Sequence, residues 1–193
     1  MSDVLVRPTT PEDAPAMVAL AADLREWFNP DVPEEVRADC ARCTGWAAVD
    51  AEGGLVGFAL GLASGDEYVI KWLAVARERH RHGVGKLLIG RLIETARSSS
   101  LKRLVVDTLA ATHDYEPYAR TRAFYEACGF TLERIERAGF PEGSDKAVYV
   151  LPLAACPARP GSGKELAPAL RGPTCLPQRG EENERGRGST RWG

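Results

Sequence analysis

The sequence has little net charge and no long apolar run, and each absence excludes a class of protein. Its 193 residues hold 25 Lys and Arg against 27 Asp and Glu, a formal net charge of -2. Proteins that bind nucleic acid usually carry clustered positive charge, so we expect no nucleic-acid partner. No stretch approaches the roughly 20 apolar residues that cross a bilayer, and the first residues lack the order of a signal peptide. We therefore expect a cytoplasmic protein with no membrane partner.

Cysteine is also scarce, at five residues. An odd number of cysteines without a secretion signal indicates reduced thiols rather than a disulfide framework. Cys40 and Cys43 form a C-x-x-C pair, but no second pair supplies the remaining ligands of a zinc site. We predict two half-buried helix cysteines and no metal.

The apolar pattern predicts one domain over residues 1–153. Thr10, Pro11 and the acidic Asp13 form the start signal of a helix that continues to about Phe28. The predicted order β-α-α-β-β-β-α-β-α-β-β gives a mixed sheet flanked by helices, of the α/β or α+β class. Further helices are predicted over residues 33–43, 84–96 and 119–128, and strands over residues 4–7, 46–50, 55–63, 67–75, 103–108, 130–136 and 147–153.

The composition changes at about Ala154, where Pro, Gly, Arg and Glu replace large apolar residues. Such a stretch cannot bury enough surface to offset the entropy lost on ordering. We predict that residues 154–193 are a disordered tail.

A basic turn follows the strand that ends at Val75 and opens an amphipathic helix. Glycine lets the backbone approach a ligand closely, and the free N–H groups and dipole of a helix N-terminus favour an anion. The segment has neither a Walker A pattern nor the third glycine of a dinucleotide fingerprint. It therefore predicts a phosphate site on the helix N-terminus, made by Arg81, His82, Gly83, Val84, Gly85 and Lys86.

Two motifs in order resemble those of the GCN5-related N-acetyltransferase (GNAT) superfamily. The turn is similar to its motif A, [Q/R]-x-x-G-x-[G/A], and residues 123–130 (AFYEACGF) are similar to its motif B, with the core F-Y-x-x-x-G-F. The resemblance covers roughly residues 4–153. His80 stands where motif A has Gln or Arg, and Tyr118 stands where many relatives have Asn. Arg81, or the backbone together with Lys86, would then contact the phosphates.

The resemblance implies a centrally splayed sheet and an enzyme that moves an acetyl group from acetyl-CoA directly to a primary amine. Tyr125 is the expected proton donor to the leaving thiolate, and Glu67 is the expected general base acting through water. A strand N–H would stabilise the developing oxyanion. The pantetheine arm is expected along Leu73, Ala74 and Val75, with the pyrophosphate on the turn. Other candidates for a base or polar contact are Asp107, His113, Asp114 and Glu116.

The resemblance also implies an acceptor pocket built by the first helices and the late loops. Its expected lining is Trp27, Phe28, Tyr115, Tyr118 and the turn at residues 138–141. The expected acceptor is a small-molecule amine. There are two alternatives: an enzyme that acetylates a protein lysine or N-terminus, and a non-catalytic module that binds acyl-CoA. A homodimer is possible.

Overall fold

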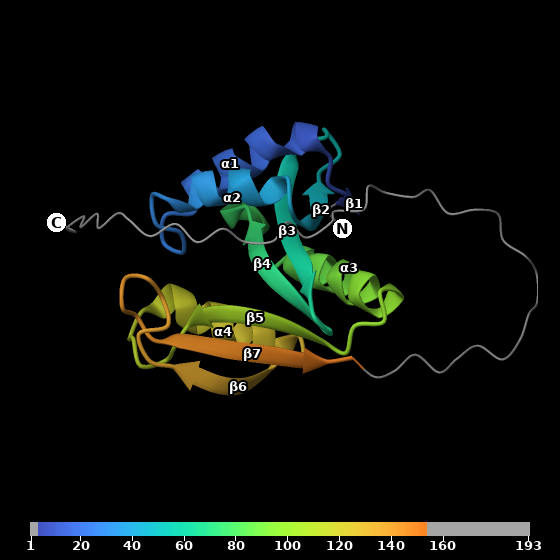
Figure 1. Ribbon diagram of the computed structural model, residues 1–193. Coiled ribbons are helices and arrows are strands. Elements are labelled where there is room, and N and C mark those ends of the chain that lie inside the picture. The colour runs from blue at the N-terminus through green and yellow to red at the C-terminus, as the bar shows by residue number, and fades with distance from the viewer. Residues whose placement is uncertain (1–3, 154–193) are drawn as a thin grey trace, which may run out of the picture. The chain divides into compact units, whose positions relative to one another are not determined.

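A seven-stranded mixed sheet, in the order β1-β2-β3-β4-β5-β7-β6, forms the centre of the fold (Figure 1). The computed structural model describes residues 4–153, so the predicted tail lies outside the described residues. None of the helices in this range is long and apolar enough to cross a membrane. The elements are β1 (Leu5–Pro8), the 3-10 helix η1 (Pro11–Asp13), α1 (Ala14–Asp23), α2 (Val32–Cys40), β2 (Thr44–Val49), β3 (Leu55–Ser64), β4 (Glu67–Val75), η2 (Arg77–Arg79), α3 (Val84–Ser98), β5 (Arg103–Leu109), α4 (Glu116–Ala127), β6 (Thr131–Glu136) and β7 (Lys146–Pro152).

The sheet splits between β4 and β5, which run parallel to each other. The two strands pair only from Glu67 opposite Arg103 to Ile70 opposite Val106. β4 continues to Val75 and β5 to Leu109, and in the described part of the chain no strand pairs with residues 71–75 on the side of β5. Figure 1 shows the resulting two halves, β1–β4 with α1 and α2, and β5–β7 with α4. The predicted splayed sheet is therefore confirmed.

An irregularity in the middle of β4 changes which side chains face each layer. Trp72 pairs with Leu60 and Ile70 pairs with Gly61, so Lys71 is an extra residue in the strand. Such a bulge shifts the alternation of side chains by one residue. Ile70 therefore packs in the core under α3, whereas Ala74 packs against α1 and α2.

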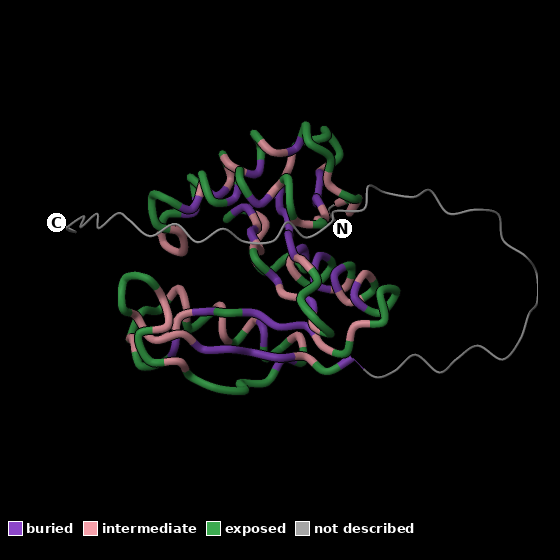
Figure 2. The backbone as a smooth tube through the Cα atoms, viewed as in Figure 1, coloured by how far each residue is buried: buried purple, intermediate pink, exposed green. Residues whose placement is uncertain are grey.

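Two hydrophobic clusters lie on opposite faces of the sheet. Met17 of α1 and Val36 of α2 cover Phe58 and Leu60 of β3 on one face. α3 and α4 share a second cluster, in which Leu88 and other side chains of α3 meet the inner side of α4. Figure 2 shows buried residues along β5 and β7; α4 covers one face of these strands, and Val105, Val148 and Val150 form a separate small cluster.

Apart from the 3-10 turn that opens the first helix, three helix boundaries lie three or more residues from their predicted positions. α1 ends at Asp23 instead of Phe28, because Leu24 leaves the helical conformation with φ -91 and ψ 51. α2 ends at Cys40, which leaves Cys43 outside the helix. α4 begins at Glu116 instead of residue 119, with a proline in its first turn, where the missing N–H costs nothing.

Candidate active site

The polar backbone atoms of two β4 residues face the side of the strand where its pairing with β5 has ended. The Ala76 N–H donates to the Val56 carbonyl, and Val75 lies opposite Gly57. This register makes Val75 and Gly57 a non-hydrogen-bonded pair, so the N–H and C=O of Val75 point away from β3. Such pairs recur at every second residue of an antiparallel strand, so Leu73, opposite Ala59, is also in a non-hydrogen-bonded pair. Both residues therefore turn their backbone groups toward β5, where β4 no longer has a partner.

Ala74, the third residue predicted to contact the pantetheine arm, differs from its neighbours. In the same alternation its N–H and C=O point toward β3, opposite Phe58. Its methyl group is buried against α1 and α2. The structure thus brings Leu73 and Val75 to the cleft by their backbone and leaves Ala74 as a packing residue.

The turn before α3 has one position that is open to a ligand. Gly83 has φ +85, and no heavy atom lies within 4 Å of the place where a Cβ would be. Arg81, His82 and Lys86 are exposed around it. The N–H groups of the first turn of α3 begin here, so the geometry suits an anion.

The side chain of Val84 and the missing side chain of Gly85 serve packing, while their backbone N–H groups belong to the first turn of α3. Val84 is buried in the core. A Cβ on Gly85 would lie 3.0 Å from Cε2 and Cζ of Phe124, so this glycine allows α4 to pack closely on α3. The second motif is therefore in direct contact with the first.

Tyr125 lies beside Phe124 on α4 and is buried between two aromatic rings. Its ring centroid is 5.4 Å from that of Phe124 and 5.4 Å from that of Phe130. It belongs to the cluster against which Leu73 and Val75 pack. Burial raises the pKa of the Tyr125 phenol well above its usual value, so the hydroxyl stays protonated and acts as a hydrogen-bond donor rather than as an acid.

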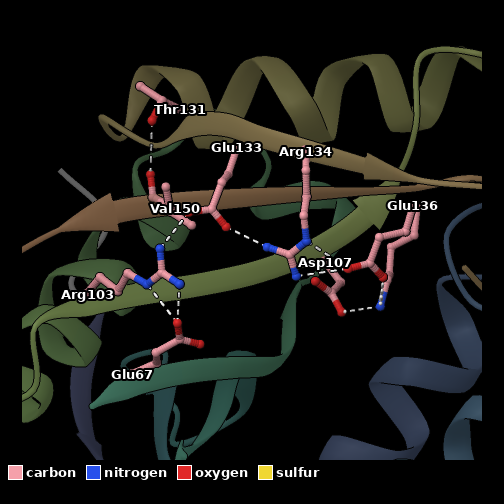
Figure 3. Close-up of polar contacts among 9 residues, drawn as sticks. Glu67, Arg103, Asp107, Thr131, Glu133, Arg134, Glu136 and Val150 are labelled. Carbon is pink, nitrogen blue, oxygen red and sulfur yellow. Dashed lines mark hydrogen bonds and ion pairs between the residues drawn. The ribbon is translucent and has the colours of Figure 1, made fainter. Parts of the chain in front are cut away.

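Glu67 lies at the closed end of the sheet, away from this site. The Arg103 Nε donates to its Oε1 at 2.7 Å, as Figure 3 shows. Glu67 stands six residues before Leu73, which at about 3.3 Å per residue is roughly 20 Å along the strand. Because of this distance, the geometry does not support the predicted role of Glu67 as general base.

The Glu67–Arg103 pair is one end of a line of ion pairs across β4, β5, β6 and β7 (Figure 3). At the other end, Lys146 Nζ lies 3.1 Å from Asp107 Oδ2 and 2.9 Å from Glu136 Oε2. Asp107 follows Val106, the last β5 residue paired with β4. The side chain of Asp107 is 41% exposed, so this carboxylate at the point of separation is open to solvent. The members between the two ends are Glu133 and Arg134.

The other candidate bases have local partners or lie in solvent. The His113 Nε2 accepts the backbone N–H of Asp145 at 3.0 Å. Glu116 pairs with Arg120 one helical turn later. Asp114 is exposed in the loop before α4.

The aromatic residues predicted for the acceptor pocket contact one another, α4 or β4. The Trp27 Nε1–H donates to the Pro117 carbonyl at 3.1 Å, and the Tyr118 hydroxyl donates to the Trp27 carbonyl. Burial raises the pKa of Tyr118 to about 12. Phe28 packs edge-on against Trp72 of β4, with centroids 5.9 Å apart. Tyr115 is more exposed, and its ring lies 6.1 Å from that of Tyr118.

Sequence reasoning missed the role of His80. Its Nε2–H donates to the Val75 carbonyl at 2.8 Å, so it holds one of the backbone groups that face the cleft. The sole signal in the sequence was its departure from the Gln or Arg of motif A. This contact joins a side chain to the end of a strand five residues earlier. It depends on the path of the turn, which the sequence pattern does not predict.

The cysteines and other potential metal ligands do not form a centre. Cys40 and Cys43 are free and half-buried, and burial raises the pKa of both thiols. Within residues 4–153, no group of three or more His, Cys, Asp or Glu side chains is placed to hold a metal ion.

A mixed sheet that splits between two parallel strands, beside a helix N-terminus suited to an anion, defines the GNAT-like class of acyltransferase folds. A family model described as "Acetyltransferase (GNAT) family" matches residues 14–130, more than half of the chain. The protein belongs to the GNAT acetyltransferase family, as its two motifs predicted.

Solved structures share the fold at low sequence identity. An acetyltransferase of the GNAT family from Desulfovibrio desulfuricans has a TM-score of 0.68 and 24% identity, over 78% of this chain and 99% of its own. The ribosomal-protein-S18-alanine N-acetyltransferase of Escherichia coli has a TM-score of 0.66 and 20% identity, over 81% and 97%. An aminoglycoside 6'-N-acetyltransferase in complex with coenzyme A has a TM-score of 0.63 and 17% identity, over 79% and 99%. No curated protein matches the sequence.

Proposed function

We propose that the protein is an N-acetyltransferase that moves the acetyl group of acetyl-CoA directly to a primary amine of a small molecule. One observation carries this proposal. The backbone groups of Leu73 and Val75 face the side of β4 that has no partner strand among the described residues, and the open turn at Gly83 follows that strand.

The residues of the cleft fit an acyl-CoA. The amides of a pantetheine arm can pair with a free strand edge as an added strand would. Leu73 offers an N–H and a C=O and Val75 offers an N–H, whereas the C=O of Val75 is held by His80. The pyrophosphate suits the N-terminus of α3 at Gly83, where Arg81 and Lys86 add positive charge. When bound, the thioester supplies an acetyl group activated for transfer.

The side chains near the cleft supply the proton transfers. The amine must be neutral to attack, yet an alkyl ammonium, like that of lysine, has a pKa of about 10.4. Asp107, exposed where β4 and β5 separate, is the carboxylate best placed to take a proton through water. Tyr125, kept protonated by burial, can stabilise the leaving thiolate by donating a hydrogen bond to it. One of the two N–H groups of Leu73 and Val75 can donate to the carbonyl oxygen as it gains charge, which leaves the other for the pantetheine arm.

The structures of similar fold do not decide the acceptor. One is named for a ribosomal protein and another for an aminoglycoside, and both resemble this chain at 20% identity or less. The acceptor therefore has to be found by measuring thiol release from acetyl-CoA with a broad panel of amines.

Tyr125→Phe tests the mechanism once an acceptor is known. We expect a fall in kcat of about tenfold or more, with the affinity for CoA kept within about twofold, because the hydroxyl acts on the leaving group. Calorimetry measures the affinity for CoA, and steady-state kinetics measure kcat. If the variant and the wild type have equal activity, Tyr125 has only a packing role. If the wild type binds CoA but acetylates none of the amines, the protein is a binding module and not an enzyme.

A further inference from the structure

We infer that Thr108 is a further catalytic residue, whose hydroxyl donates a hydrogen bond to the sulfur of CoA as the thioester breaks. This inference rests on the proposed function and adds a residue to the same site. Thr108 is only 3% exposed, and its Oγ1 is buried without a hydrogen-bond partner among the residues that the structure describes. A buried polar group without a partner is costly, so such a group calls for a bound molecule or a function.

The side chain of Thr108 is directed to the side of the sheet that α4 covers. Thr108 lies opposite Ala147 of β7. Opposite residues of an antiparallel pair share a face, and Ala147 belongs to the cluster that contains Tyr125. α4 also contacts the next residue of β5, because Arg122 Nη1 donates to the Leu109 carbonyl at 2.9 Å. Tyr125 follows Arg122 by three residues, so both lie on the same side of α4.

Thr108 also lies at the level where the free edge of β4 begins. β4 and β5 pair last at Ile70 and Val106. Thr108 is two residues beyond Val106. Leu73 is three residues beyond Ile70, but the bulge in β4 accounts for one of the three. Leu73 and Thr108 therefore stand at about the same distance from the last pair, one on each side of the split. The side chain of Leu73 packs against the same cluster as Tyr125.

The proposed path of CoA brings its sulfur to this level. The pyrophosphate is proposed at Gly83, beyond the end of β4, and the arm runs back from there along Val75 to Leu73. The thioester is at the far end of the arm, so it comes to lie near Leu73. Thr108 faces this position from β5, and Tyr125 faces it from α4.

The chemistry of the transfer gives this hydroxyl a use. When the amine attacks, a C–N bond forms, the C–S bond breaks and its electron pair stays on sulfur. The proton of the amine passes through water to Asp107, and the thiolate takes a proton from solvent as CoA leaves. A threonine hydroxyl does not give up its own proton at neutral pH, so Thr108 stabilises the thiolate by a hydrogen bond beside that of Tyr125. Hydrogen bonds to a charged group are about twice as strong as neutral ones.

Titration of the thiol of bound CoA tests this contact before any acceptor is known. The difference in ultraviolet absorbance between the complexes with CoA and with desulfo-CoA, which lacks the thiol, reports the thiolate. Thr108→Val keeps the shape of the side chain and removes the hydroxyl. We expect it to raise the pKa of the bound thiol by about 1 pH unit, because the thiolate loses a donor. Thr108→Ser keeps the hydroxyl and should keep the wild-type pKa.

Turnover gives a second readout once an acceptor is found. Thr108→Val should lower kcat about tenfold and keep the affinity for CoA within about twofold, because the hydrogen bond strengthens only as charge develops on sulfur. Thr108→Ser should recover most of kcat. A residue with only a packing role would show neither the loss nor the recovery.

Stability gives a third readout, with a matched control. The hydroxyl of Thr108 has no partner in the described part of the chain, so Thr108→Val should keep or raise the midpoint of urea unfolding. Thr95→Val is the control, because the Thr95 hydroxyl accepts from Trp46 Nε1 at 3.0 Å and donates to the Arg91 carbonyl at 2.8 Å. This control should lower the midpoint and leave the thiol pKa and kcat unchanged.

The outcomes separate this inference from the proposed function. A wild-type thiol pKa and kcat in folded Thr108→Val would overturn the role of Thr108 and leave the acetyltransferase standing. If Thr108→Val does not fold, Thr108→Ala removes the same hydroxyl and is judged by the same titration. If the wild type shows the expected thiol titration but acetylates no amine, the proposed function is overturned, while the contact between Thr108 and sulfur stands.

Discussion

Individual residues of the turn before α3 divide between ligand approach and packing. Gly83 combines a left-handed φ of +85 with empty space around its Cβ position, and Gly85 is pressed against the ring of Phe124. A glycine is required at both positions, but for different physical reasons. The first reason is the left-handed backbone of the turn, where we propose that CoA binds, and the second is the contact between α3 and α4.

Gly83→Val tests whether the pyrophosphate binds at the turn. The variant places a branched side chain in the open space, so we expect CoA affinity to fall about tenfold or more. Gly53→Val is the matched control, because Gly53 has φ +83 and equally open surroundings in the β2–β3 turn. Both variants carry backbone strain of about 1–2 kcal/mol, but the control should bind CoA as the wild type does. Calorimetric affinities that are the same for both variants would contradict this placement of the cofactor.

The two carboxylates at opposite ends of the line of ion pairs give a second comparison. Asp107→Asn should lower kcat by about a hundredfold if Asp107 accepts the proton of the amine, since general-base catalysis contributes about that much. Glu67→Gln should leave kcat within about twofold, because Glu67 is tied to Arg103 at the closed end of the sheet. The pH dependence of kcat, measured for both variants, tests the assignment. A larger loss from Glu67→Gln would restore the base role first predicted for Glu67.

At the scale of helices and strands, periodicity predicted the elements but not their ends. The strand at Glu67–Val75 was predicted with the bounds it has, because β-branched and aromatic residues fill it. Its bulge at Lys71 was not predicted, since a bulge is defined by the partner strand and not by the strand itself. α1 was predicted five residues too long because Leu24, Trp27 and Phe28 keep a helical spacing, although Trp27 is used in contacts with α4.

The start of the first helix, by contrast, was encoded locally. Asp13 accepts the backbone N–H of Thr10 at 2.8 Å, as the acid of a capping box does. It also forms a two-pronged pair with Arg7 of β1, at 2.7 and 2.8 Å. One carboxylate therefore connects the helix start to the edge strand.

Asp13→Asn should destabilise the protein in a pH-dependent manner. The guanidinium of Arg7 holds the pKa of Asp13 below its usual value, so the stabilisation is present above about pH 4 and is lost as the pH falls through the folded-state pKa. We expect a loss of about 1–3 kcal/mol in the free energy of unfolding near neutral pH and a smaller difference in acid. Urea unfolding at both pH values measures it. Glu34→Gln removes an exposed pair with Arg37 and should cost less than about 1 kcal/mol, which serves as the control.

For the whole molecule, the two motifs predicted the family, but not the point where the sheet splits. The point where the sheet splits is set by pairing between β4 and β5, whose residues are 36 apart in the sequence. Because the sequence does not reveal this pairing, Glu67 was expected beside the cofactor. It lies instead at the closed end of the sheet. The contacts of Trp27 join residues 90 apart, and no local pattern encodes them.

Alkaline pH offers a test of how strongly the two halves are joined. Burial raises the pKa of Tyr118 to about 12 and that of Tyr125 higher still, whereas an unfolded tyrosine ionises near pH 10. The unfolded chain therefore loses these protons first, so their contribution to stability is complete below about pH 10 and is lost as the pH rises toward the folded-state values. The free energy of unfolding, measured in urea, should fall steadily above about pH 9. Tyr118→Phe should be less stable than the wild type at neutral pH by about 1 kcal/mol, because the hydrogen bond to Trp27 is lost, and its stability should fall less steeply in alkali. Parallel pH profiles for the two proteins would show that the phenol of Tyr118 is not held between the halves of the sheet.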